Sequence, residues 1–274
     1  MQRPIARLAI GSLRRTSCCS CSRAYTTNAQ SPHPALTILP DYLDAIEQDV
    51  LLRNSLRLLD SPARTNSAGR KRRRDWIKQN PHWDGRRGFM ADEAYAWEEG
   101  HFDGVIKRYR EMLVREGMWA SAPPLPDAEQ LEAALAKIYS LLPPPATAPP
   151  EIPPRSPPSH LILHLLHLAS DGAIYPHVDN LEAFGRTIVG VSLGGERVMR
   201  FKRSSESAQE TGDPGPTEFE VLLEPGSAYI QREPLRTFYT HEVLGMTTWR
   251  GRSVGGSQRL SIMLRDRLDR DADA

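Results

Sequence analysis

Two histidines and one aspartate stand out in the 274-residue chain because their types and spacing suggest metal chemistry. His177 and Asp179 are two residues apart, so on an extended strand their side chains would point to the same face. His241 lies far downstream, within the strand-like segment 238–243. Two imidazoles and a carboxylate leave three positions open on a metal, which suits Fe(II) enzymes that bind a cosubstrate together with oxygen. A structural histidine beside an aspartate is the alternative interpretation.

A pair of arginines strengthens the metal interpretation. If the segment 259–265 (RLSIMLR) is a strand, Arg259 and Arg265 lie on the face opposite to its leucines. Buried arginines are costly unless they meet anions, and these two would be about 20 Å apart along a strand. Their long side chains could therefore bracket a small dicarboxylate bound at the metal. The alternative is an edge strand whose arginines face water.

Short β-rich segments must position these residues. Turn residues such as Glu224-Pro225-Gly226 separate the segments and indicate tight reversals of the chain. A series of short strands separated by turns favours an all-β sandwich or barrel, with the jelly roll among the candidates. The segments predicted as strands are 187–193, 198–202, 219–223, 227–231 and 259–265.

Helices are predicted upstream of the strands. Apolar residues recur at helical spacing over 41–60, with a start at Pro40-Asp41. A second helix is expected to begin at a capping box formed by Asp127 and Gln130 and to stop at Pro143. Between them, Arg70–Arg74 reads RKRRR, which is typical of a solvated surface segment; a phosphate-contacting patch is the alternative.

The N-terminus has the composition of a mitochondrial transit peptide. Residues 1–40 contain no acidic side chain, and five arginines are spread through a Ser- and Thr-rich stretch, with cleavage expected after Tyr25. Without those five arginines, the 35 basic side chains fall to 30 against 34 acidic ones. All three cysteines are clustered at 18–21, which excludes a disulfide framework elsewhere. The longest apolar stretch, Leu161–Ala169, is too short to cross a bilayer, so no transmembrane segment is expected.

At this point the chain resembles the AlkB-type 2-oxoglutarate and Fe(II)-dependent dioxygenases. HxD, a distal His and RxxxxxR occur in the family's order, and the segments AIYPHVDN, FGRTIVGVSL and LLEPGSAYI are similar to it as well. The resemblance covers about Leu36 to Arg265 and implies a mainly β fold with N-terminal helices (α+β), a double-stranded β-helix or jelly roll. It also implies Fe(II) as the metal, with 2-oxoglutarate and O2 as cosubstrates. The roles it implies are iron ligation by His177, Asp179 and His241, and 2-oxoglutarate contacts by Arg259 (distal carboxylate), Arg265 (metal end) and Tyr229.

The domain organisation follows from the leader, the prolines and the resemblance. Nine of the 23 prolines lie between Leu141 and His160, where neither a helix nor a central strand can form. We therefore expect a transit peptide at 1–25, an N-terminal helical support region at 26–140, a Pro-rich connector at 141–159 and the double-stranded β-helix core at 160–267. If the segment around His160, His164 and His167 were helical, a second metal cluster would be the alternative; as a strand, His167 faces away from the other two.

The expected function is oxidation of a substrate in the mitochondrial matrix. The resemblance implies that oxidative decarboxylation of 2-oxoglutarate drives hydroxylation of a C–H bond, or demethylation where that carbon is an N-methyl group. The net acidic mature chain favours a protein substrate, and the resemblance links it to regulated necrosis and fatty-acid metabolism. One alternative is a mitochondrial RNA N-demethylase, for which RKRRR with Trp76 and Trp83 offers a basic patch with aromatics. The other is a non-catalytic metal-binding signalling protein.

Overall fold

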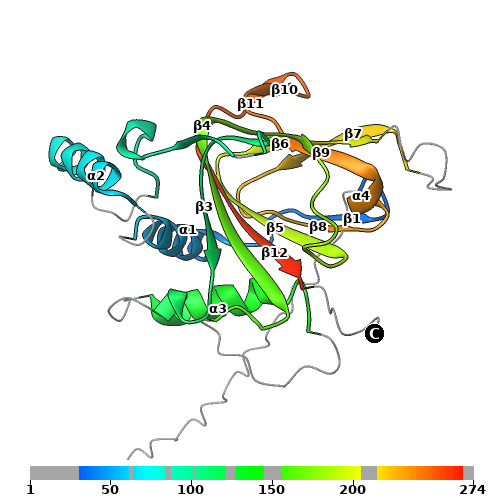
Figure 1. The fold of residues 1–274 in the computed structure, drawn as a ribbon, viewed down its shortest axis with the longest axis horizontal. Coiled ribbons are helices and arrows are strands. Elements are labelled where there is room, and N and C mark those ends of the chain that lie inside the picture. The colour runs from blue at the N-terminus through cyan, green and yellow to red at the C-terminus, as the bar shows by residue number, and fades with distance from the viewer. Residues whose placement is uncertain are drawn as a thin grey trace, which may run out of the picture.

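The computed structural model describes residues 31–61, 65–83, 88–101, 103–120, 127–144, 156–204 and 215–267. Its centre is a curled antiparallel sheet in which the strand order is β1-β8-β5-β12-β4-β9-β6-β7, with β3 added beside β4 and β2 beside β3 (Figure 1). The strands of this sheet are β1 (Leu36–Leu39), β2 (Glu98–Gly100), β3 (Ile106–Val114), β4 (Leu161–His177), β5 (Thr187–Gly194), β6 (Arg197–Arg203), β7 (Glu218–Leu223), β8 (Ala228–Arg232), β9 (Tyr239–Val243) and β12 (Arg259–Asp266).

A separate hairpin and four helices complete the fold of the described residues. The hairpin consists of β10 (Thr247–Trp249) and β11 (Arg252–Val254). The helices are α1 (Ala45–Leu59), α2 (Ser67–Gln79), α3 (Ala128–Tyr139) and the short α4 (Leu235–Phe238). Two 3-10 turns, η1 (Asp92–Ala94) and η2 (Met118–Ala120), lie between them. None of the described helices is both long and apolar enough to cross a membrane.

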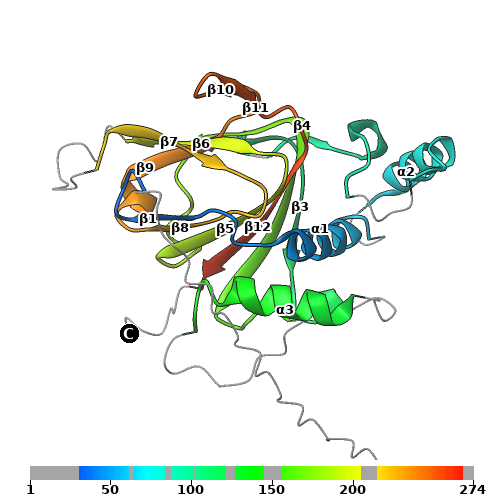
Figure 2. The ribbon, with the colours of Figure 1, turned by 180° about the vertical axis from the view of Figure 1, so that it is seen from behind.

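The long strand β4 joins the two halves of the curled sheet. Its first part pairs with β12 and β3, whereas its end pairs with β9 through Ile174 and His177. The half β8-β5-β12-β4 therefore continues into the half β4-β9-β6-β7, and the two curl around a shared interior (Figures 1 and 2). This topology confirms the predicted mainly β jelly roll.

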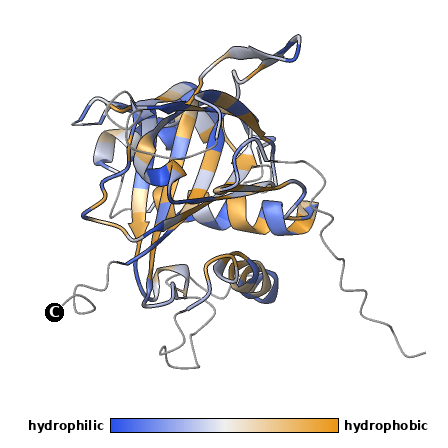
Figure 3. Cartoon of the chain, turned by 90° about the vertical axis from the view of Figure 1, so that its right-hand side faces the viewer, coloured by the Kyte–Doolittle hydropathy of each residue, from blue (hydrophilic) through white to orange (hydrophobic). Residues whose placement is uncertain are grey.

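Apolar side chains form two large cores, one on each face of the sheet. The helix-facing core packs α1 and α3 onto β12, β4 and β5, with Leu51, Leu135 and Ile262 fully buried. The inner core lies inside the curl and includes Leu168, Phe201 and residues of β7 to β9. Figure 3 shows the resulting alternation of hydrophobic and hydrophilic bands along the strands. Because the leucines of β12 belong to the helix-facing core, its arginines point inside the curl, as predicted.

The helix starts differ from the sequence prediction. Asp44, rather than Asp41, caps α1: its carboxylate accepts from the backbone N–H groups of Ile46 and Glu47, while Glu47 accepts from the backbone N–H of Asp44. Asp41 cannot begin the helix because its φ of 49° is left-handed. The predicted capping box at α3 is wrong, since the Asp127 side chain makes no cap hydrogen bond and lies 3.0 Å from an Arg53 guanidinium nitrogen instead.

The region before β4 also contributes strands to the sheet. In addition to α1, α2 and α3, the segment 26–140 contains β1, which pairs with β8, and β3, which pairs with β4 along most of its length. The RKRRR run is part of α2. The predicted transit peptide, 1–25, lies outside the described residues, as does 145–155 of the predicted connector. The domain boundaries stay predictions.

Candidate metal centre

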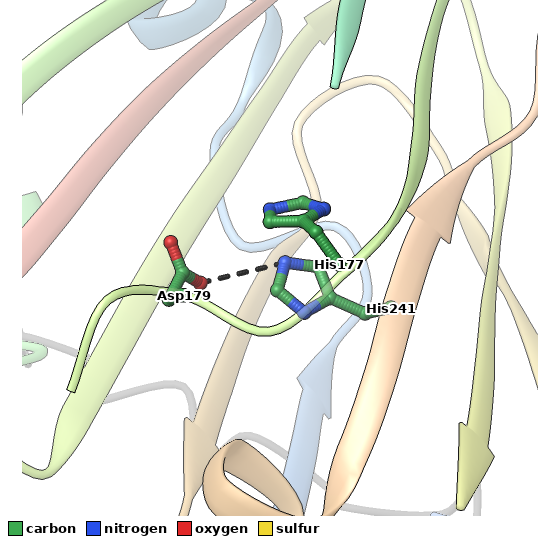
Figure 4. A group of neighbouring side chains, drawn as sticks. All are labelled: His177, Asp179 and His241. Atoms are coloured by element: carbon green, nitrogen blue, oxygen red, sulfur yellow. Dashed lines mark ion pairs between the residues drawn. The ribbon is translucent and has the colours of Figure 1, made fainter. Parts of the chain in front are cut away.

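Three ligand-type side chains converge at the junction between the two halves of the sheet. His177 is the last residue of β4, and its Cα partner across the ladder is His241 in β9. Asp179 was expected on the same strand as His177, but it lies just beyond the end of β4. The chain nevertheless brings its carboxylate back to the imidazoles, and the three ligand atoms lie within 4.8 Å of one another (Figure 4).

The protonation states at this centre suit a metal. Burial lowers the pKa of His241 to about 4, so its imidazole is neutral at physiological pH. Burial by itself raises the pKa of the Asp179 carboxyl, but the interactions of the carboxylate with His241, in its protonated form, and with the Arg265 guanidinium outweigh it and lower that pKa. Neutral imidazoles and an ionised carboxylate are the forms that bind a metal.

Unused donor atoms support the same conclusion. His177 Nδ1 lies 2.9 Å from the Tyr175 carbonyl oxygen and donates to it, which leaves the lone pair of the neutral ring on Nε2. His241 Nε2 lies 3.4 Å from Asp179 Oδ2. His241 Nδ1 is buried and makes no hydrogen bond within the described part of the chain. The donor set of two imidazoles and a carboxylate therefore fits a divalent metal such as Fe(II).

The two predicted arginines lie at opposite ends of β12 and have different surroundings. Arg265 donates from Nη2 to Asp179 Oδ1 at 3.1 Å, which places it at the metal end. Arg259 is 2% exposed, and its hydrogen-bond partners among the described residues are two neutral hydroxyls, Ser192 Oγ at 3.0 Å and Ser261 Oγ at 3.5 Å. Among the described residues, no carboxylate lies within ion-pair distance of Arg259. Burial lowers its pKa to about 10, so it is a buried cation without an anionic partner.

Tyr229 lies on β8 inside the curl, directly opposite Gly190 of β5. Its side chain is buried, and burial raises the pKa of its phenol. The hydroxyl therefore stays protonated and is available as a hydrogen-bond donor in the interior that also contains Arg259 and Arg265. The structure thus brings all six predicted site residues to the inner side of the sheet or to its metal-end junction.

Sequence reasoning missed other residues of this region. Ser192 and Ser261 hold Arg259, and Gly190 makes room for Tyr229. Arg236 of α4 is 2% exposed and donates from Nη2 to the carbonyl oxygens of Asn180 and Phe184, so it holds the segment that follows Asp179. Strand alternation in RLSIMLR places Ser261 beside Arg259 and could have identified it, whereas nothing in the local sequence marks Arg236.

The three histidines at the start of β4 do not form a second metal cluster. His160 Nε2 lies 3.1 Å from the Leu142 carbonyl oxygen, and His164 Nε2 lies 3.1 Å from Glu111 Oε2. His167 is fully buried on the opposite side of the strand and bonds to Arg110 and Gln258. In the described part of the chain, His177, Asp179 and His241 are the one group of three side chains able to hold a metal.

A model of the 2OG-Fe(II) oxygenase superfamily matches residues 35–265. The chain belongs to this superfamily. Members of the superfamily use Fe(II) and 2-oxoglutarate to activate O2. The match begins just before β1 and ends at Arg265, so it includes the N-terminal helices as well as the curled sheet.

Curated relatives of this 2OG-Fe(II) oxygenase are similar over part of their length. The mitochondrial alpha-ketoglutarate-dependent dioxygenase alkB homolog 7 of Mus musculus is 32% identical over 148 residues, 54% of this chain and 54% of that protein. The protein of the same name from Bos taurus is 37% identical over 105 residues, 38% of this chain and 44% of that protein. The chain thus spans about half the length of the curated relatives it matches.

Among solved structures, OsALKBH1 aligns with 86% of this chain and 100% of its own, at 17% identity and a TM-score of 0.45. A likeness of this size carries no argument about the site. The assignment of the fold rests on the strand order described above, and membership of the superfamily rests on the match to residues 35–265.

Proposed function

We propose that the chain is a 2-oxoglutarate- and Fe(II)-dependent dioxygenase of the alkB homolog 7 type, with iron held by His177, Asp179 and His241. The observation that carries the proposal is Arg259, a fully buried guanidinium whose neighbours are neutral hydroxyls, on the inner side of the sheet that ends at the ligand cluster. A buried cation is costly without an anion, and the distal carboxylate of 2-oxoglutarate supplies one.

Different residues of the chain bind 2-oxoglutarate and orient the metal ligand. Arg259 pairs with the distal carboxylate, Tyr229 donates a hydrogen bond to the same cosubstrate, and Arg265 orients Asp179 from the metal end. Iron held there would allow O2, the oxidant, to oxidise 2-oxoglutarate to succinate and CO2, with one oxygen atom entering succinate and the other a substrate C–H bond. The buried walls around Arg259 and Tyr229 exclude water from the cosubstrate.

A protein in the mitochondrial matrix is the substrate class that the charges favour. Glu111 places a carboxylate on the inner face of β3, because its partner across the ladder, Leu166, belongs to the inner core. The exposed carboxylates of Glu98 and Asp103 lie along the same edge of the sheet, where they disfavour a polyphosphate backbone. The mitochondrial location is supported by the arginine-rich N-terminus and by the names of the relatives.

RNA is the second candidate substrate, and α2 supports it. Lys71, Arg74 and Lys78 are exposed and recur at spacings of three and four residues, so they share one face of the helix. The helix extends away from the curled sheet, at the left of Figure 1. Arg73, in contrast, is committed to the protein itself, since its Nε lies 3.2 Å from Asp60.

One experiment tests the reaction and the substrate class together. The purified protein, with Fe(II) and 2-oxoglutarate, is incubated with mitochondrial protein and with mitochondrial RNA, and succinate release is measured beside mass spectrometry for a gained oxygen or a lost methyl. The variant Asp179→Ala, which lacks one of the three proposed iron ligands, serves as the inactive control. We expect wild-type succinate release, its loss in Asp179→Ala, and a gained oxygen on protein. Unchanged turnover in Asp179→Ala would contradict the assigned iron site. No succinate release by the wild type would favour the non-catalytic alternative, and a lost methyl on RNA would favour the RNA demethylase.

A further inference from the structure

A chain of buried and partly buried polar side chains runs across β3 and β4 and ends next to Arg259. Asp60, the C-cap of α1, lies 2.7 Å from Nη1 of Arg110 on β3. Arg110 Nη2 lies 3.0 Å from His167 Nδ1 on β4, and His167 Nε2 lies 2.9 Å from Gln258 Oε1. We call Asp60, Arg110, His167 and Gln258 the polar relay.

The directions of the hydrogen bonds in the polar relay are fixed. A guanidinium can only donate, so His167 Nδ1 must accept from Arg110 and the ring proton must lie on Nε2. Nε2–H then donates to Gln258 Oε1, which turns the amide nitrogen of Gln258 toward the Met90 carbonyl oxygen, 2.7 Å away. Each of these hydrogen bonds therefore joins one donor to one acceptor, whereas Arg110 Nε is buried without a partner among the described residues.

His167 is held rigidly within the polar relay. Its ring is fully buried, stacks on Phe89 at 4.8 Å between centroids and meets the edges of Tyr95 and Trp97. Burial, followed by the charge of Arg110, lowers the pKa of His167 well below its ordinary value, so the ring stays neutral. An imidazole in this position cannot tilt without losing both of its hydrogen bonds.

The far end of the polar relay fixes the backbone that precedes Arg259. The carbonyl oxygen of Gln258 accepts from Gly195 N at 2.7 Å, while its side chain is held by His167 and Met90. Gly194, the ladder partner of Arg259, has a φ of +85°, and the ring of Phe89 fills the space that a side chain there would need. Gln258, which precedes Arg259 in the chain, and Gly194, which pairs with it in the β5–β12 ladder, are therefore both fixed from the helix-facing side.

We propose that His167 and Gln258 are positioning residues that aim Arg259 at the distal carboxylate of 2-oxoglutarate. The inference rests on the proposed function, in which Arg259 binds that carboxylate. Two neutral serine hydroxyls hold the Arg259 guanidinium, so its direction depends strongly on the backbone from which it starts. A shift at Gln258 moves the guanidinium relative to a ligand that is anchored at the metal.

The test compares two ligands that differ at the distal end. 2-Oxopentanoate has the same chain length as 2-oxoglutarate but lacks the distal carboxylate. Dissociation constants for both are measured by titration calorimetry with Mn2+ in place of iron. We expect His167→Leu to weaken 2-oxoglutarate binding by about tenfold while 2-oxopentanoate binding changes little, because one charge-assisted contact is misdirected.

A rescue variant and a control separate positioning from general loss of stability. His167→Gln offers an acceptor to Arg110 and a donor to Gln258, so it should restore most of the preference for 2-oxoglutarate. Leu163→Ala leaves a cavity at a buried residue of the same strand without touching the polar relay, and it should leave the ratio of the two constants unchanged. If His167→Leu fails to fold, Gln258→Leu should reduce the same ratio.

Several outcomes overturn the proposal. Equal weakening of both ligands in His167→Leu, no rescue by His167→Gln, or an unchanged ratio in Gln258→Leu each shows that the polar relay does not aim Arg259. A wild-type protein without preference for 2-oxoglutarate over 2-oxopentanoate instead contradicts the proposed role of Arg259. The wild-type ratio thus tests the function, and the change in that ratio tests the positioning.

Discussion

The ring of Tyr229 occupies the space where a side chain at Gly190 would lie. The two residues are direct partners in the β5–β8 ladder, and a Cβ built on Gly190 would stand 2.6 Å from the tyrosine hydroxyl oxygen and closer still to two ring carbons. A non-glycine residue at 190 is therefore incompatible with the present position of Tyr229. The glycine is needed for close approach rather than for an unusual backbone angle.

Gly190→Ala should displace Tyr229 and weaken 2-oxoglutarate binding. Overpacking of this kind costs about 1–3 kcal/mol of stability. Titration of the variant with 2-oxoglutarate and Mn2+, together with chemical unfolding, measures both effects. Gly100→Ala is the matched control, because the nearest atom to its added Cβ is 4.0 Å away. An affinity equal to wild type in Gly190→Ala would remove Tyr229 from the cosubstrate site.

Metal binding should distinguish two histidines of the same strand. His177→Ala removes one of the three converging ligands and should weaken Mn2+ binding by at least about tenfold. His164→Ala removes an imidazole that contacts Glu111 instead and should leave the Mn2+ affinity near that of wild type. Titration of both apoproteins with Mn2+ checks the pair, and equal losses would show that the metal lies elsewhere.

His167 should make the folded protein sensitive to mild acid. Its pKa is depressed in the folded state, so below about pH 6.5 the unfolded chain binds a proton that the folded chain does not. Stability is therefore present above this pH and is lost as the pH falls. Between pH 7.5 and 5.5 the wild type should lose about 1.4 kcal/mol more than His167→Gln, measured by urea unfolding. Identical losses would mean that His167 is protonated in the folded protein.

The packing of α3 should stabilise the sheet. Leu135 of α3 is fully buried against the sheet, and Leu135→Ala should cost about 2–5 kcal/mol of unfolding free energy. Ile46→Ala, on an exposed position of α1, should change stability by less than about 0.5 kcal/mol. Thermal and urea unfolding compare the two variants. A small effect at Leu135 would indicate that α3 is not docked as described.

Local rules sufficed where one strand or one short motif carries the information. Alternation in RLSIMLR placed Arg259 and Arg265 on the face away from the leucines, where the structure has them. The HxD argument expected Asp179 on the strand of His177, whereas Asp179 lies just beyond β4 and reaches the imidazoles from there. The series of short strands indicated an all-β sandwich or barrel, and the resemblance to the family narrowed it to the jelly roll. The N-terminal strands were missed because β1 and β3 acquire their pairing partners only from segments far along the chain.

Long-range contacts explain the remaining differences. Asp127 has the composition of a helix cap, yet Arg53 on another helix attracts its carboxylate. The partners of His167 are 57 and 91 residues away, so its role could not be read from its neighbours in the chain. The RKRRR run became helical because Trp76 and Ile77 pack against the small apolar cluster around Met90 and Tyr95.

The continuity of β4 makes the spacing along this one strand functionally important. Leu163 and Leu165 face the helices at one end, and His177 meets His241 at the other. Successive residues of a strand alternate faces, so inserting or deleting one residue between Ala169 and Ile174 would turn His177 away from its partners while the helix packing stayed in place. Homologues should therefore vary in length at the Ser204–Gly215 connection or before β4, and should keep a constant number of residues within it.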